Sequence, residues 1–147
     1  MPIYPLVCSA TDRYSLPMQK ARIVLILVAF GFIGFGMFGL VAPLALVGAV
    51  DITAETAQGR TELRAVYGGL QLGLGVFLLM ASSLRSWMRP ALALTICSLL
   101  GLACARLLGI QMEGGAFPWM LPLAALELGL AVLSVWAWSA CRHDLTG

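Results

Sequence analysis

Arg106 and Glu127 are charged residues inside two strongly apolar stretches of the sequence. A helix expected over 90–112 ends about six residues after Arg106, which places this side chain about 9 Å deep at 1.5 Å per residue. A helix expected over 119–141 places Glu127 about eight residues from its start, or about 12 Å deep. A short turn joins the two helices, so they should pack antiparallel with both charges at similar depth. The spacing predicts an Arg106–Glu127 ion pair.

The free-energy cost of burying a charge favours direct contact between Arg106 and Glu127. A lone charge near the centre of a membrane helix costs about 2.5–3.5 kcal/mol on insertion scales, so such residues usually face the bundle interior and find partners. Pairing Arg106 with Glu127 offsets much of that cost.

A second polar group lies on the helix expected over 63–82. Arg64, Tyr67 and Gln71 are spaced i, i+3 and i+7 and share one helix face, on which Gln71 reaches about the depth of Glu127. The inner halves of the expected helices are almost entirely apolar, so the polar side chains gather in the outer half. This asymmetry predicts a polar pocket that opens towards the periplasm. Its predicted residues are Arg106, Glu127, Tyr67, Gln71, Arg64 and Glu62.

Two interpretations of this cluster stay open. In the first, Arg106, Glu127, Tyr67 and Gln71 form a buried network that sets helix register and does no chemistry. In the second, they line a site for an amphiphilic ligand, a proton or a reacting lipid. Glu62 and Arg64 lie near the interface, where a negative charge also suits a helix N-terminus.

The residue types present in the chain exclude most kinds of catalytic centre. The single histidine of the chain, His143, lies in the C-terminal tail, so no histidine-based metal, haem or triad site can form. Cys97 and Cys104 lie about 10 Å apart on one expected helix, too far for a disulfide. We therefore predict no catalytic residue, no metal site and no cofactor. Any catalysis would rest on a carboxylate, with Glu127 as the acid and Tyr67 assisting.

The amino-acid composition indicates that the expected helices lie in a membrane. Only 11% of the 147 residues are charged and 61% are hydrophobic, whereas a soluble domain carries roughly 25% charged residues. Lipid is therefore the expected solvent, and scattered basic residues with a net charge of +2 exclude a nucleic-acid-binding face. We predict an all-α integral membrane four-helix bundle at 21–142, preceded by a loosely ordered cytoplasmic tail at 1–20. The expected helices cover about 21–42, 63–82, 90–112 and 119–141.

Prolines and glycines mark the ends and contact faces of these helices. Pro43 should end the first helix, and residues 44–50 then form a short interfacial helix or an extension after a kink. Pro90 suits the first turn of the third helix. Gly69 and Gly73 form a GxxxG pair, which usually indicates close helix packing. Four glycines on the first helix and a row of small residues on the third offer further packing surface. That row is Gly101, Ala105 and Gly109.

The distribution of basic residues predicts the orientation. With four spans, both termini and the loop near Arg85 lie on one side of the membrane, together with most of the basic residues. These residues are Arg13, Lys20, Arg22, Arg85, Arg89 and Arg142, against Arg60 and Arg64 on the other side. The positive-inside rule therefore places both termini in the cytoplasm.

The segment 61–70, with Arg106 and Glu127, resembles a family of small bacterial four-helix integral membrane proteins of unknown function. The most specific piece of the resemblance is Glu-x-Arg-Ala-x-Tyr-Gly-Gly at Glu62–Gly69, and the resemblance covers about residues 20–140. The chain departs from the family at 113–115, where it has Glu-Gly-Gly and the family often shows an Asp-Gly step. The resemblance implies the same topology, the same polar residues and no assigned activity.

These observations lead to several functional hypotheses for a multi-pass protein of the bacterial inner membrane. The first is a non-enzymatic protein whose polar pocket binds a lipid or a lipophilic small molecule. The second is an accessory subunit of a larger membrane complex, or a homodimer, that uses the exposed small-residue faces. Further alternatives are a carboxylate-based isomerase or cyclase, and a small proton-coupled transporter that uses Glu127.

Overall fold

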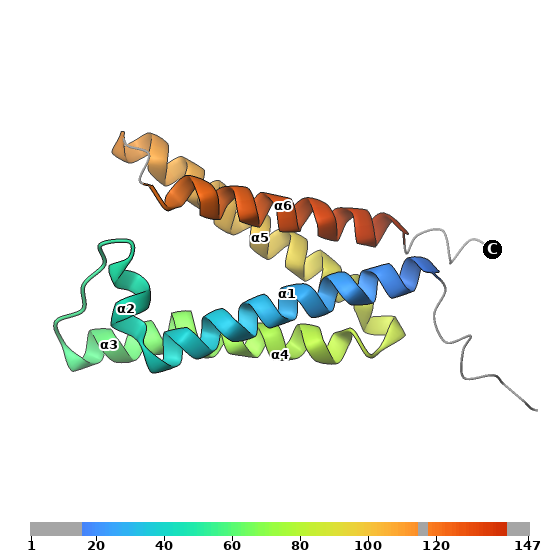
Figure 1. Cartoon of the computed structure of the whole chain (residues 1–147), viewed down its shortest axis with the longest axis horizontal. Coiled ribbons are helices and arrows are strands. Elements are labelled where there is room, and N and C mark those ends of the chain that lie inside the picture. The colour runs from blue at the N-terminus through green and yellow to red at the C-terminus, as the bar shows by residue number, and fades with distance from the viewer. Residues whose placement is uncertain (1–15, 115–117, 141–147) are drawn as a thin grey trace, which may run out of the picture.

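The computed structural model describes residues 16–114 and 118–140, and every regular element in these two ranges is helical. Figure 1 shows the long helices α1 (Leu16–Val41), α5 (Arg85–Glu113) and α6 (Met120–Ala140). The short helices α2 (Pro43–Gly48) and α3 (Ala57–Leu63) connect α1 to the π-helix η1 (Arg64–Leu70), which continues into α4 (Gln71–Ala81). The prediction of an all-helical chain is confirmed for this part of the molecule.

Four helical segments are long and apolar enough to cross a membrane, as judged by their length and composition. The second is continuous through α3, η1 and α4. The segments are Met18–Val41, Ala57–Ser82, Arg85–Glu113 and Met120–Ala140. The four predicted long helices are therefore present. Residues 1–15 of the predicted tail and the residues after 140 lie outside the described part.

The helix starts differ from those expected. Helix α1 begins at Leu16 rather than near residue 21, since Pro17 is compatible with a first helical turn. The second segment begins at Ala57 rather than near 63, because the Thr56 side chain caps it by accepting a hydrogen bond from the Gly59 amide at 3.0 Å. Polar residues can continue a helix beyond its apolar part. The expected starts, which were based on hydropathy alone, therefore lie too far along the chain.

Pro43 and Pro90 play different parts in the helices. Pro43 does separate two helices: Ala42 leaves the helical conformation with φ −131°, and α2 begins at the proline. The prediction that Pro90 lies in the first turn of its helix is wrong, because α5 begins at Arg85 and carries Pro90 inside. As the sixth residue of α5, Pro90 lies beyond the first turn, so it removes the hydrogen bond that its amide would donate to the Ser86 carbonyl oxygen, and its ring crowds that carbonyl group.

The helices pack as two pairs. Helix α1 lies along η1 and α4, whereas α5 lies along α6. Figure 1 shows the two pairs meeting where α1 begins and α4 ends, and diverging towards the other end. The main core cluster lies where the pairs meet and includes Leu25, Leu78, Met88 and Leu92. We call this the closed end, and the end that carries α2, α3 and the C-terminus of α5 the open end.

Glycines allow α1 to approach η1 and α4 closely. A Cβ atom on Gly36 would lie 2.6 Å from the Leu72 amide nitrogen, and one on Gly75 would lie 2.9 Å from the Ala29 carbonyl oxygen. A Cβ atom on Gly39 would overlap the backbone of Tyr67, and one on Gly68 would lie 2.7 Å from Leu40 Cγ. We call Gly36, Gly39, Gly68 and Gly75 the glycine seam.

The predicted GxxxG pair is not part of this seam. Among the described residues, a Cβ atom on Gly73 would meet nothing within 4 Å, and one on Gly69 would touch only the Arg64 carbonyl oxygen at 3.9 Å. The GxxxG prediction is therefore wrong for this fold. The row at 101, 105 and 109 on α5 also lacks a close neighbour in the described part of the chain, where Cβ atoms on Gly101 and Gly109 would meet nothing within 4 Å.

Candidate functional site

Arg106 and Glu127 form the predicted ion pair. The Arg106 Nε atom donates to both carboxylate oxygens of Glu127, at 3.0 Å to Oε1 and 3.1 Å to Oε2. Arg106 lies seven residues before the end of α5 and Glu127 seven residues after the start of α6, or about 10 Å from the same end. The two side chains are 27% and 11% exposed, so the pair is largely removed from the surface.

The pair uses only part of the guanidinium group. Besides Nε, Arg106 Nη1 donates to the Met120 sulfur at 3.6 Å, a weak acceptor. An arginine carries five N–H donors, and within the two described ranges no further acceptor contacts Arg106. The Nη edge can therefore donate to a ligand without breaking the ion pair.

A cavity of about 240 Å³ lies between the two helix pairs, on the open-end side of the core. Arg106, Glu127, Tyr67 and Gln71 all line it. The rest of its wall is glycine and large apolar side chains from α1, α5 and α6. These residues are Leu27, Val28, Gly31, Phe32, Phe35, Leu99, Leu102, Leu123, Leu126 and Leu130. Four polar side chains thus meet in an otherwise apolar chamber.

Gln71 contributes an unsatisfied acceptor to this chamber. Its Oε1 atom is buried and has no hydrogen-bond partner in the described part of the chain. A buried polar atom without a partner destabilises the fold by about 1–3 kcal/mol, and such atoms are uncommon in native proteins. A donor supplied by a bound molecule would remove this penalty.

The π-helix η1 positions Tyr67 beside Gln71. Residues four apart, such as Tyr67 and Gln71, share a helix face, whereas the wider turn of a π-helix, with its i→i+5 hydrogen bonds, moves a residue three before Tyr67 away from that face. Tyr67 and Gln71 both line the cavity, whereas Arg64 does not. Single-turn π-helices occur frequently at functional sites, and this one lies within the segment that carries the family resemblance.

The structure does not bring Arg64 or Glu62 to the cavity. Arg64 is exposed, and its Nε donates to the Leu40 carbonyl oxygen at 3.1 Å, at the end of α1. Glu62 is exposed on α3. The expected shared face assumed α-helical periodicity, and the π-helix breaks that periodicity at Arg64.

Sequence reasoning missed the apolar part of the wall. Phe32, Phe35 and Gly31 of α1 face the cavity, but in an apolar helix nothing in the sequence separates these residues from those that face outwards. Met120 was also missed as a contact of Arg106. It lies seven residues before Glu127 and therefore on the same helix face, a spacing that could have suggested this contact.

The described residues offer little for metal or two-residue acid–base chemistry. No group of three or more His, Cys, Asp or Glu side chains that could hold a metal ion occurs within residues 16–114 and 118–140. Glu127 is the one carboxylate that these residues contribute to the cavity wall, and its oxygens already accept from Arg106. The arrangement suits recognition of a polar head group beside an apolar chain.

A family model described as a domain of unknown function, DUF4345, matches residues 20–138. The chain belongs to the DUF4345 family. The match spans α1 to α6 almost completely and includes every residue of the cavity wall. No curated protein and no solved structure matches the chain. The expectation of a family without assigned function is confirmed, and the DUF4345 match carries no activity to this chain.

Proposed function

We propose that this DUF4345 protein spans a membrane with its four long helices and binds an amphiphile between its two helix pairs. The length and composition of the four helices support the first part. So does their outer surface, where large apolar side chains are strongly exposed: Phe30 at 60%, Met80 at 62% and Val132 at 69%. Exposed apolar surface of this extent in water would cause aggregation.

The charges support an orientation in which the closed end faces the cytoplasm. Lys20 and Arg22 near the start of α1, and Arg85 and Arg89 at the start of α5, lie at the closed end. Two basic residues, Arg60 and Arg64, lie at the open end, together with the acidic residues Asp51, Glu55, Glu62 and Glu113. By the positive-inside rule, four basic residues against two place the open end on the periplasmic side of a bacterial inner membrane.

The observation that carries the binding proposal is the convergence of four polar side chains on one small apolar cavity. At about 240 Å³ the cavity is slightly smaller than the roughly 300–1,000 Å³ of common ligand pockets. It suits a head group and the first part of a chain, with the remaining chain in lipid. The head group needs an acceptor for the Arg106 Nη edge and a donor for Gln71 Oε1.

A medium-chain monoacylglycerol is a suitable probe, since its hydroxyl groups both donate and accept. The protein, reconstituted in nanodiscs of zwitterionic lipid, is incubated with this probe, and native mass spectrometry counts the retained molecules. We expect one retained molecule for the native chain and about tenfold weaker retention in Gln71→Leu and Arg106→Met, because each loses one hydrogen bond to a ligand in a buried site.

Cys104→Ser is the matched control. Cys104 lies on α5 near the depth of Arg106, is exposed, and does not line the cavity. Equal retention in all four proteins would reject the binding proposal and leave the polar cluster as a network that sets helix register.

A second candidate function is that of a subunit in a larger membrane assembly or homodimer. The observation that favours it is the open small-residue face of α5, where Cβ atoms on Gly101 and Gly109 would meet nothing within 4 Å. Small residues at such a face let a second helix approach closely. In mild detergent, Gly101→Leu would then shift the protein to a smaller species, whereas a native chain that already migrates as a monomer argues against this function.

A further inference from the structure

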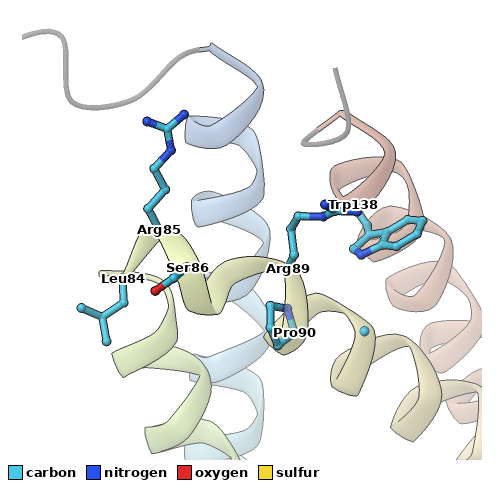
Figure 2. A pocket seen from close by; sticks show the side chains of 7 residues that line it. Leu84, Arg85, Ser86, Arg89, Pro90 and Trp138 are labelled. Carbon is cyan, nitrogen blue, oxygen red and sulfur yellow. The ribbon is translucent and has the colours of Figure 1, made fainter. Parts of the chain in front are cut away.

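A second cavity lies at the closed end, at the other end of the molecule from Arg106 and Glu127. The cavity is an open groove with a volume of about 850 Å³. Figure 2 shows the side chains that line it at the start of α5. Its wall combines two arginines and a serine with apolar side chains. The lining residues are Leu84, Arg85, Ser86, Arg89, Pro90, Ala93 and Trp138.

The groove is strongly cationic. Arg85 and Arg89 both line it, and no carboxylate of the described residues does. The carboxylates of the described ranges are at positions 51, 55, 62, 113 and 127, in the open half of the molecule. None of them forms a salt bridge with Arg85 or Arg89. The groove wall therefore carries two positive charges that these acidic groups do not neutralise.

Arg89 is held in place, yet one of its donors lacks an acceptor. Its guanidinium carbon lies 5.3 Å from the centre of the Trp138 ring, a cation–π contact that orients the side chain. Figure 2 shows Arg89 extended from α5 towards Trp138. Its Nε atom is buried and has no hydrogen-bond partner among the described residues. A buried charged donor without an acceptor is unfavourable, and an anionic oxygen in the groove would supply the acceptor.

The start of α5 adds to the positive potential. Arg85 and Ser86 begin this helix of 29 residues, and no side chain caps it at Leu84. The third amide, that of Trp87, already donates to the Leu84 carbonyl oxygen at 2.9 Å, so the free amides are those of the first two residues. The first amide N–H groups of a helix lack internal partners and carry a partial positive charge that favours phosphate. The Ser86 hydroxyl group in the same turn is a further donor on the groove wall.

The apolar part of the groove wall indicates which kind of molecule carries the anion. Pro90, Ala93 and the Trp138 ring lie beside the arginines, so a chain attached to the anion would remain on apolar surface. Lys20 at the same end lies 5.2 Å from the centre of the Trp136 ring. Tryptophans and basic side chains together are typical of the head-group level of a membrane.

We propose that this groove binds the phosphate group of an anionic phospholipid from the leaflet at the closed end. Arg85 and Arg89 contact the phosphate oxygens, the first turn of α5 supplies amide donors, and the acyl chain leaves along Pro90 and Ala93. Basic pockets between helices on the cytoplasmic side commonly bind anionic head groups. The inference rests on the proposed membrane insertion, but not on binding in the cavity at the open end.

The test uses the full chain in nanodiscs that contain equal amounts of phosphatidylglycerol and phosphatidylcholine. Native mass spectrometry measures the ratio of the two lipids that stay bound to the released protein. We expect the native chain to retain phosphatidylglycerol preferentially and Arg89→Gln to lose about tenfold or more of that preference. Arg85 is exposed, so Arg85→Gln keeps the packing intact and should also lose several-fold.

Lys20→Gln is the matched control, because it removes one positive charge from the same end outside the groove. We expect it to keep most of the preference. An equal loss in Lys20→Gln and Arg89→Gln would overturn the proposal in favour of general surface attraction, as would a native chain without preference. A third arm adds inorganic phosphate: displacement of phosphatidylglycerol at millimolar phosphate would identify a soluble phosphate as the ligand and reject the lipid.

Different experimental outcomes would contradict lipid binding in the groove and the proposed function. A chain that does not enter nanodiscs at all would contradict membrane insertion. A chain that enters them and retains the monoacylglycerol, but shows no lipid preference, would contradict only the groove.

Discussion

Arg106 of α5 and Glu127 of α6 form an ion pair between the two helices, and the same two residues form part of the polar cavity wall. Breaking a buried pair by removing one partner leaves an uncompensated charge, whereas replacing both partners by apolar residues can be close to neutral. This difference separates the contribution of the pair to stability from a contribution to binding.

We expect Arg106→Met to lower the free energy of unfolding by about 3 kcal/mol, because Glu127 then stays buried without its partner. The double variant Arg106→Met with Glu127→Leu should recover most of this loss. Equilibrium unfolding in mixed detergent micelles, analysed as a double-mutant cycle, measures both values. Additive losses in the double variant would show that the two side chains do not act as a pair.

We expect Gln71 to lower the stability of the empty protein and to contribute to binding of the ligand. Without a ligand, its Oε1 atom is buried and has no partner among the described residues, so Gln71→Leu should raise the free energy of unfolding of the empty protein by about 1 kcal/mol. The same variant should lose monoacylglycerol retention. Thermal unfolding in lipid-free detergent checks the first statement, and a lower melting temperature would mean that the glutamine has a structural role.

At the scale of elements, the glycine seam decides how closely the first pair of helices packs. A side chain at Gly36 or Gly39 must displace backbone atoms rather than flexible side-chain ends. The seam also fixes η1 against α1 and thereby the orientation of Tyr67 and Gln71 towards the cavity.

We expect Gly36→Ala to lower the free energy of unfolding by about 1–3 kcal/mol, the range for overpacked contacts. Gly73→Ala is the control from the same pair of helices, because its Cβ atom would meet nothing within 4 Å. It should be neutral or stabilise by about 0.5–1 kcal/mol, since alanine is the better helix former. Unfolding in detergent compares the two, and equal effects would contradict the close contact of α1 with α4.

At the scale of the whole molecule, two helix pairs joined at one end produce two different ends. The closed end holds the core and the cationic groove, whereas the acidic residues at positions 51, 55, 62 and 113 lie at the open end and the cavity lies on the open-end side of the core. The proposed function assigns the closed end to the cytoplasm.

Reporter fusions test this orientation. A fluorescent protein fused after Gly147 should fluoresce, because the proposed topology keeps it in the cytoplasm, where that reporter folds. Alkaline phosphatase fused after Glu113 at the end of α5 should be active, because it would be exported to an oxidising compartment where its disulfides form. The reverse pattern would contradict this orientation and place the open end on the cytoplasmic side.

The sequence by itself determined the four long helices and the Arg106–Glu127 pair. Helix length follows from the length of the apolar runs, and the pair follows from matched depths on two helices that a short turn makes antiparallel. Membership of a family without assigned function was also predicted from the sequence.

Only the tertiary structure decided which helices pair, which glycines are in contact, and which polar residues reach the cavity. An apolar helix is nearly as hydrophobic on its outer face as on its inner face, so its periodicity does not reveal which side is buried. The π-helix η1 therefore removed Arg64 from the predicted pocket, Glu62 lies on α3 outside it, and helix rotation put Gly68 and Gly75, rather than the Gly69–Gly73 pair, into the close contact. The groove at Arg89 and Trp138 joins residues from two helices whose relative rotation the sequence does not specify.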